Sequence, residues 1–337
     1  MSFIGNSKVK VVFRLSHMGD VTLTTGVLSH WHEKNGDTFV FITRAENAPL
    51  LANHPAISEV IALEEDVLKG KAWLNEARRL AAAYKGHPLI DLHGTLRSRI
   101  LSLVWRGKVR RYPKFGLMRR LYDLTHAERF RIPLEAINVP QRYCMALEGK
   151  PPAARDLVPN IHITDAERAA ASVHLKNISR INPLVALHPY ATHPAKQWPR
   201  EHWQGLTARL AGAGMDWFIV GYNDEPLFAN HDRDFTNKTT LRETCALMEK
   251  ADLLITGDSG PMHLATSVGT PVAALFGPTA KAWGFYPSGP EDRVLELDLD
   301  CRPCSLHGSK MCSQGYECLI GMTPEYVVDI ARHMLDI

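Results

Sequence analysis

The sequence predicts an α/β protein of two domains, each built around a parallel β-sheet. Its 337 residues favour two domains over one. In both halves, apolar runs typical of buried strands alternate with helical segments, which indicates βαβ units. Between the halves, residues 150–160 (KPPAARDLVPN) hold three prolines and little periodicity, so this segment is the best candidate for a linker. We expect the two sheets to face a central cleft.

The expected elements follow one another regularly along the chain. In the first half, strands are predicted at residues 9–15, 39–43, 57–63 and 89–92, and helices from about residue 21, at 74–84 and at 96–105. In the second half, strands are predicted at 184–187, 217–220, 253–255 and 272–276, and helices at 200–212, 240–250 and 262–268.

Composition and charge narrow the functional class. Hydrophobic residues make up 45% and charged residues 22%, which is typical of a soluble globular protein. A net charge of +3 is too small to argue for a nucleic-acid partner. No apolar run approaches the roughly 20 residues that cross a bilayer, and the N-terminal segment lacks a signal-peptide pattern. We therefore expect a cytoplasmic protein.

The most informative segment spans residues 251–279. A buried strand there ends in the turn Thr256-Gly257-Asp258-Ser259-Gly260, and Pro261 suits the first position of the helix that follows. Turns at the carboxyl ends of strands bind ligands in open α/β sheets. Glycines and a free helix N-terminus present backbone N–H groups to an anion, so the groups from Ser259 to Met262 could hold a diphosphate.

Two side chains in this segment are candidate ligands. Asp258 would repel a diphosphate, so it suits hydrogen bonds from sugar hydroxyls. His263 lies on the first helical turn and could donate to a phosphate, with a structural histidine as the alternative.

Asp20 ends the turn Ser16-His17-Met18-Gly19-Asp20, close to a helix N-terminus. A carboxylate there can take a proton from a bound hydroxyl. The other interpretation is a helix cap, because aspartate is among the commonest capping residues.

Two further strand ends carry charged candidates. Lys196, in Lys196-Gln197-Trp198-Pro199, could neutralise a phosphate as a point charge, or it could be an exposed loop lysine. After the strand at 217–220, Asp224 or Glu225 could hydrogen-bond ribose hydroxyls. A first-turn acid favoured by the helix dipole is the alternative for this pair.

Two clusters remain open. Cys301, Cys304, Cys312 and Cys318 could form a structural zinc site, but their spacing is irregular and reduced thiols fit better. The first half also carries scattered basic residues, which suit a solvated surface, an anionic acceptor or an anionic membrane surface. They are Arg97, Arg99, Arg106, Lys108, Arg110, Arg111, Lys114, Arg119 and Arg120.

Five motifs in chain order resemble one family. They are Leu15-Ser16-His17-Met18-Gly19-Asp20-Val21, Asp91-Leu92-His93-Gly94-Thr95-Leu96-Arg97-Ser98, Lys196-Gln197-Trp198-Pro199, Gly257-Asp258-Ser259-Gly260-Pro261-Met262-His263-Leu264-Ala265 with Phe276-Gly277-Pro278-Thr279, and the cysteine cluster followed by Met322-Thr323-Pro324-Glu325. Together they are similar to glycosyltransferase family 9, the ADP-heptose:lipopolysaccharide heptosyltransferases.

The resemblance implies a GT-B fold with two Rossmann-like domains. The acceptor domain would be residues 1–160, joined by a C-terminal helix at 322–337 that crosses back to it. The nucleotide-sugar domain would be residues 161–321. The reaction would be an inverting heptosyl transfer from ADP-heptose, as donor substrate, to an anionic lipopolysaccharide inner-core acceptor. No metal or cofactor is implied, and peripheral contact with the cytoplasmic face of the inner membrane is expected.

The same resemblance assigns roles to single residues. Asp20 would be the general base on the acceptor hydroxyl, and Lys196 would stabilise the departing ADP. Glu225 would hold the ribose. Asp258, Ser259, Gly260 and His263 would line the diphosphate and heptose. Thr192 would contact the nucleotide as the single threonine of a loop where the family has paired threonines.

Other functions are compatible with parts of this pattern. A GT-B transferase or epimerase that uses another nucleotide-sugar, such as a UDP-sugar, would keep the same turns. A non-catalytic nucleotide- or glycan-binding module would need no base, so the presence of both Asp20 and Lys196 argues against it. A dinucleotide-dependent oxidoreductase is disfavoured, because no G-x-G-x-x-G follows a predicted strand.

Overall fold

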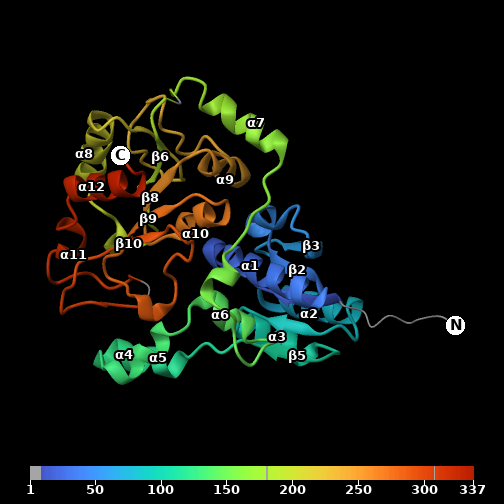
Figure 1. The fold of residues 1–337 in the computed structure, drawn as a ribbon. Helices are drawn as coiled ribbons and strands as arrows, with labels where there is room; N and C mark the ends of the chain where they lie inside the picture. Colours follow the sequence, from blue (N-terminus) through green and yellow to red (C-terminus); the bar gives the residue numbers. More distant parts are fainter. Residues whose placement is uncertain (1–8, 180, 307) are drawn as a thin grey trace. The chain divides into compact units, whose positions relative to one another are not determined.

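The structure is a computed structural model that describes residues 9–179, 181–306 and 308–337. The chain divides into two compact units (Figure 1). Unit 1 comprises the described part of Met1–Lys114 together with Val139–His162. Unit 2 comprises Phe115–Asn138 and the described part of Ile163–Ile337.

Unit 1 is built on a parallel sheet. Within its described residues the sheet has five strands in the order β3-β2-β1-β4-β5. The strands are β1 (Val9–Phe13), β2 (Thr38–Arg44), β3 (Ile57–Leu63), β4 (Leu89–Asp91) and β5 (Val109–Arg111). The α-helices are α1 (Met18–Asn35), α2 (Gly70–Ala83), α3 (Leu96–Val104) and α6 (Val139–Cys144), with 3₁₀ helices η1 (Ala45–Leu51) and η2 (Ala154–Leu157).

The centre of unit 1 forms because β1 is apolar on both faces. Val11, Val12 and Phe13 are fully buried, as expected of a central strand in a parallel sheet covered by helices. The predicted linker is packed against the rest of unit 1. Its residues 154–157 form η2, and Leu157 is buried. Gly26 of α1 permits this approach, because a Cβ there would lie 2.3 Å from the Val158 carbonyl oxygen.

Unit 2 also contains a parallel sheet. Among the described residues its order is β10-β9-β8-β6-β7. The strands are β6 (Leu184–His188), β7 (Asp216–Ile219), β8 (Leu253–Gly257), β9 (Val272–Leu275) and β10 (Arg293–Leu295). The helices are α4 (Gly116–Thr125), α5 (Glu128–Glu135), α7 (Asp165–His174), η3 (Pro194–Lys196), α8 (Arg200–Gly212), α9 (Leu241–Glu249), α10 (Gly260–Ser267), η4 (Lys281–Trp283), α11 (Glu317–Ile320) and α12 (Pro324–Met334).

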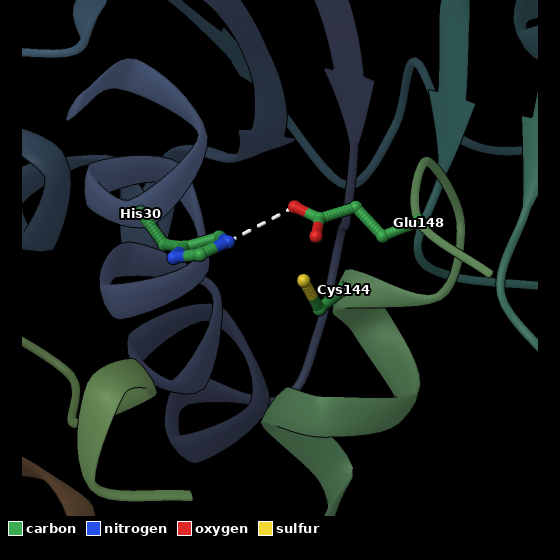
Figure 2. Close-up of side chains that lie close together, drawn as sticks. All are labelled: His30, Cys144 and Glu148. Atoms are coloured by element: carbon green, nitrogen blue, oxygen red, sulfur yellow. Dashed lines mark hydrogen bonds and ion pairs between the residues drawn. The ribbon is translucent and has the colours of Figure 1, made fainter. Parts of the chain in front are cut away.

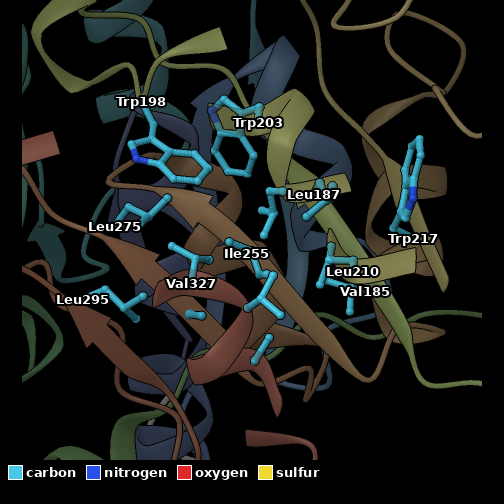
Figure 3. Packing of buried hydrophobic residues seen from close by; sticks show 14 of the residues in the cluster. Val185, Leu187, Trp198, Trp203, Leu210, Trp217, Ile255, Leu275, Leu295 and Val327 are labelled. Atoms are coloured by element: carbon cyan, nitrogen blue, oxygen red, sulfur yellow. The ribbon is translucent and has the colours of Figure 1, made fainter. Parts of the chain in front are cut away.

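The core of unit 2 is rich in tryptophan (Figure 3). Trp198 and Trp203 pack edge to face, with ring centroids 4.9 Å apart. The indole N–H of Trp198 donates to the carbonyl oxygens of Leu319 (3.1 Å) and Met322 (2.8 Å), so its one polar group is satisfied inside the core. These bonds tie the loop before α8 to the segment that leads into α12.

The C-terminal helix and the α4–α5 segment both lie in unit 2. Val327 of α12 belongs to the tryptophan-rich core, and α12 packs on α8 (Figure 1). The family resemblance implied that a helix at residues 322–337 crosses back to the N-terminal domain, and this stays a prediction. In α4 and α5, Tyr122 and Leu134 pack with Trp283 of η4, which explains why residues 115–138 leave unit 1.

The α/β fold class is confirmed. Every strand predicted from an apolar run is present, with shorter bounds in several cases. The sequence missed β5 and β10 because each has three residues and carries arginine instead of an apolar run. Within the described ranges, no helix has both the length and the apolar character needed to cross a bilayer.

Candidate active site

Asp20 lies in the first turn of α1, where His17, and not Asp20, takes the N-cap position. Its carboxylate accepts the backbone N–H of His17 at 3.2 Å, as part of a capping box. The same carboxylate pairs with the Arg14 guanidinium at 2.6 Å and accepts the Tyr143 hydroxyl at 2.9 Å. Its side chain is 14% exposed. Asp20 therefore helps to cap the helix from its third position, and Arg14 and Tyr143 hold it from two other segments of unit 1, while its role as a base stays a prediction.

The charges around Asp20 keep its carboxylate ionised. Burial favours the neutral acid, but Arg14 and the hydrogen bonds from Tyr143 and His17 outweigh it, and the pKa of Asp20 falls below its usual value. Burial and the neighbouring carboxylate raise the pKa of Tyr143 well above normal, so the phenol stays protonated and donates. Arg14 is buried and also donates to the Leu92 carbonyl oxygen at 2.6 Å, which fixes its position.

A polar network ties Glu148, which follows α6, to α1. His30 Nε2 lies 2.9 Å from Glu148 Oε1 (Figure 2). Lys34 donates to Glu148 Oε2 at 2.6 Å. Cys144 points toward the same place, and burial followed by the charge of Glu148 raises the pKa of its thiol to about 12. Because Tyr143 precedes Cys144, this network holds Tyr143 in reach of Asp20.

His30, Cys144 and Glu148 carry atoms that could ligate a metal ion. Among the described residues, they form the group whose potential ligand atoms all lie within 4.8 Å of one another. However, His30 and Lys34 already occupy the two oxygens of Glu148. The group is satisfied as an ion-pair network, and we assign it a structural role.

In unit 2, Lys196 and Asp258 form an ion pair of 2.6 Å beside the start of α10. Their side chains are 15% and 12% exposed. The Thr279 hydroxyl donates to the same Asp258 oxygen at 2.7 Å. The structure thus brings together three residues from the turns after β6, β8 and β9, as the position of these turns at strand carboxyl ends predicts.

The turn between β8 and α10 has the features of an anion site. Ser259 takes the N-cap position with an extended backbone, and its side chain makes no capping hydrogen bond to the helix. The N-terminus of α10, from Gly260, carries a partial positive charge and lies close to the Lys196 ammonium. His263, also predicted here, is buried in the first turn.

A buried polar group missed by the sequence analysis supports this turn. His188, at the end of β6, lies 3.2 Å from the Thr256 hydroxyl and 3.4 Å from the Ser259 hydroxyl through Nδ1. Burial lowers the pKa of His188 to about 4, so the ring is neutral at pH 7. It can therefore orient the Ser259 hydroxyl without adding charge.

The structure does not join Thr192 and Glu225 to this group. Both residues are exposed. Within the described part of the chain, neither side chain makes a hydrogen bond or ion pair to Lys196 or Asp258. The loop with Glu225 follows Gly221, which has a φ of +141°. A Cβ on Gly221 would lie 2.6 Å from the Tyr190 ring, so only glycine fits.

The cysteine segment supports the turn with Thr279. The described residues include all six cysteines, and each is a free thiol. Burial and the nearby thiols of Cys301, Cys318 and Cys312 raise the pKa of Cys304 to about 11. Next to Cys301, Arg302 donates to the carbonyl oxygens of Gly277 (2.5 Å) and Thr279 (3.0 Å).

The chain is similar to proteins of one family. A family model described as "Glycosyltransferase family 9 (heptosyltransferase)" matches residues 77–313. Lipopolysaccharide heptosyltransferase 2 of Salmonella typhimurium is 25% identical over 324 residues, covering 85% of this chain and 86% of that protein. Lipooligosaccharide heptosyltransferase 2 of Campylobacter jejuni is 34% identical over 104 residues, covering 31% of this chain and 32% of that protein.

Solved structures show the same fold at low identity. The glycosyltransferase family 9 protein of Veillonella parvula has a TM-score of 0.74 at 22% identity, covering 97% of each chain. E. coli ADP-heptose heptosyltransferase II has a TM-score of 0.68 at 20% identity, covering 97% of this chain and 98% of that chain.

Two further solved structures share the fold at still lower identity. E. coli heptosyltransferase WaaC, solved with ADP-2-deoxy-2-fluoro heptose, has a TM-score of 0.61 at 17% identity, covering 96% of this chain and 99% of that one. The iron-containing glycosyltransferase TibC of E. coli has a TM-score of 0.60 at 14% identity, covering 98% and 78%. The fold is therefore the GT-B-like fold of the heptosyltransferases.

Proposed function

We propose that this chain, which belongs to glycosyltransferase family 9, transfers heptose from ADP-heptose to the inner core of lipopolysaccharide. The observation that carries the proposal is the similarity to heptosyltransferase 2 over 85% of the chain. The acceptor is carried on a lipid, so the reaction would take place at a membrane, which we propose to be the cytoplasmic face of the inner membrane.

Unit 2 binds the donor in this proposal. When the sugar leaves ADP-heptose, negative charge develops on the β-phosphate. The Lys196 ammonium and the N-terminus of α10 are suited to stabilise that charge. Asp258 holds Lys196 in place until the donor binds and then accepts hydrogen bonds from sugar hydroxyls. The donor-binding residues we propose are Thr192, Lys196, Glu225, Asp258, Ser259, Gly260 and His263.

Unit 1 supplies the general base. The acceptor hydroxyl oxygen attacks the anomeric carbon, the bond from that carbon to the phosphate oxygen breaks, and ADP leaves with the electron pair. Asp20 takes the hydroxyl proton, and the single displacement inverts the anomeric configuration. Arg14 and Tyr143 support this role because they keep Asp20 ionised and fixed.

We propose that the transfer needs no metal ion. Lys196 and the α10 N-terminus already provide positive charge for the departing phosphate, which is what a divalent ion would otherwise supply. Transfer by protein treated with EDTA should therefore match transfer by untreated protein. Loss of activity on chelation, restored by one metal, would overturn this part of the proposal.

The experiment that tests the function compares donors directly. Purified protein is mixed with ADP-heptose or a UDP-sugar and with an inner-core acceptor, and nucleotide release and glycosylated acceptor are measured. Turnover restricted to ADP-heptose supports the proposal. Turnover with the UDP-sugar indicates the other transferase, and binding of ADP-heptose without turnover indicates a binding module.

A further inference from the structure

Helix α3 and the residues after it form an exposed surface that the proposed reaction does not use. We call this surface the α3 patch, and its members are Leu96, Arg99, Leu103, Arg106, Lys108 and Arg110. Leu96 is 74% exposed and Leu103 is 86% exposed, so both leucine side chains are in contact with solvent. All members lie in unit 1: three are in α3 (Leu96, Arg99, Leu103), two are in the loop after it (Arg106, Lys108), and Arg110 is in β5.

The register of α3 explains how the leucines come to be exposed. Leu96, Arg99 and Leu103 are spaced by three and four residues, which places them on one side of the helix. The other side is anchored, because Ser98 and Leu101 are buried and Leu101 belongs to the core of the unit. α3 therefore cannot turn its leucines inward without losing its own packing. Single exposed leucines are common, but two on one helical face, next to a basic segment, make a patch.

The charge of this segment is strongly one-sided. Residues 96–114 contain seven lysines and arginines and no aspartate or glutamate. Arg97 pairs with Glu65, and Arg111 pairs with Asp91. The four basic members of the α3 patch, in contrast, form no ion pair with any residue in the described part of the chain. Their positive charge is thus open to an external partner.

We propose that the α3 patch docks unit 1 on the surface of an anionic phospholipid bilayer. A helix that exposes leucines next to basic residues can bury the leucines at the headgroup boundary while the cations meet anionic lipids. A nucleic-acid backbone would match the charge but leaves the leucines without a partner. This docking surface would face the lipid that carries the acceptor. The identity of that acceptor rests on the proposed function.

Vesicles without any acceptor test the docking apart from the reaction. The full chain is sedimented with vesicles of phosphatidylethanolamine and phosphatidylglycerol, and with vesicles of phosphatidylcholine alone. Two double variants are compared with the unchanged protein: Leu96→Ser with Leu103→Ser, and Arg99→Gln with Arg106→Gln. Their matched controls are Val173→Ser with Ile181→Ser, which are 65% and 92% exposed, and Arg155→Gln with Lys176→Gln.

The proposal predicts binding to the anionic vesicles that weakens with salt, and little binding to phosphatidylcholine. Loss of two arginines should weaken binding about 25-fold, at about fivefold for each charge near the surface. Loss of both leucines should weaken it by about tenfold or more. Both control variants should bind like the unchanged protein.

Three results would overturn the docking surface. They are no binding to anionic vesicles, equal binding to phosphatidylcholine, and equal losses in the patch variants and their controls. A water-soluble acceptor fragment separates this failure from failure of the proposed function. If transfer to that fragment continues without vesicle binding, the docking surface is refuted and the proposed function stands. If the protein binds vesicles but transfers nothing, the proposed function is refuted and the docking surface stands.

Discussion

Replacing Tyr143 by phenylalanine gives the sharpest view of how Asp20 is set up. The change removes the hydroxyl that donates to Asp20 at 2.9 Å and leaves the ring and the Arg14 pair in place. A hydrogen bond to a charged group contributes about 1.5–3 kcal/mol. Since one pKa unit corresponds to about 1.4 kcal/mol, the pKa of Asp20 should rise by about one to two units in Tyr143→Phe.

The assay is the pH dependence of kcat/KM for ADP release in the presence of acceptor. If Asp20 is the base, activity requires its ionised form, and kcat/KM falls on the acidic side as that form is protonated. Because Arg14, Tyr143 and His17 lower the pKa of Asp20, the acidic limb of the unchanged protein lies below the range of an ordinary aspartate. Tyr143→Phe should move this limb upward by about one to two pH units, while the plateau above pH 7 changes far less.

A matched control removes a hydroxyl elsewhere in unit 1. Tyr84 donates to Glu59 at 2.7 Å on the surface, so Tyr84→Phe should leave the limb where it is. The reasoning fails if the limb of Tyr143→Phe does not move, or if it moves equally in Tyr84→Phe. Far-UV circular dichroism at each pH confirms that the protein measured is folded.

Three other changes have defined outcomes. Lys196→Ala should lower kcat by about 10²–10³, the usual loss of one group that stabilises transition-state charge, when ADP release is measured at saturating ADP-heptose. His188→Gln should flatten the pH dependence of Tm between pH 6.5 and 4. In that pH range the unfolded chain binds more protons than the folded chain. His188 therefore lowers the free energy of unfolding as pH falls, by up to about 3 kcal/mol. Trp198→Phe leaves the carbonyl oxygens of Leu319 and Met322 without their donor and should destabilise unit 2 by about 1–3 kcal/mol in thermal unfolding.

The sequence predicted the sheets well where strands are apolar. β1, β2 and β8 are buried runs of valine, isoleucine, leucine and phenylalanine, so their identity follows from local composition. β5, with the sequence VRR, could not be recognised because its place is decided by pairing with β4 and not by its own side chains. The packing of α12 on α8 is likewise a tertiary contact without a local signal.

In the candidate site, too, the sequence predicted the residues that have a local signal and missed a residue that a tertiary contact brings in. The ion pair of Lys196 with Asp258 joins residues that the turns had already singled out. Tyr143 was missed because 123 residues separate it from Asp20 in the chain. Arg14 did carry a signal, since a charged residue directly after the apolar run Val11–Phe13 needs a buried partner.

The most direct test of the central claim is transfer itself. Mass spectrometry of an inner-core acceptor, after incubation with this protein and ADP-heptose, should show the addition of one heptose with release of one ADP for each product formed. The unchanged protein should give this product, and Asp20→Ala should give far less. No heptosylated acceptor, or equal product from Asp20→Ala, would contradict the account.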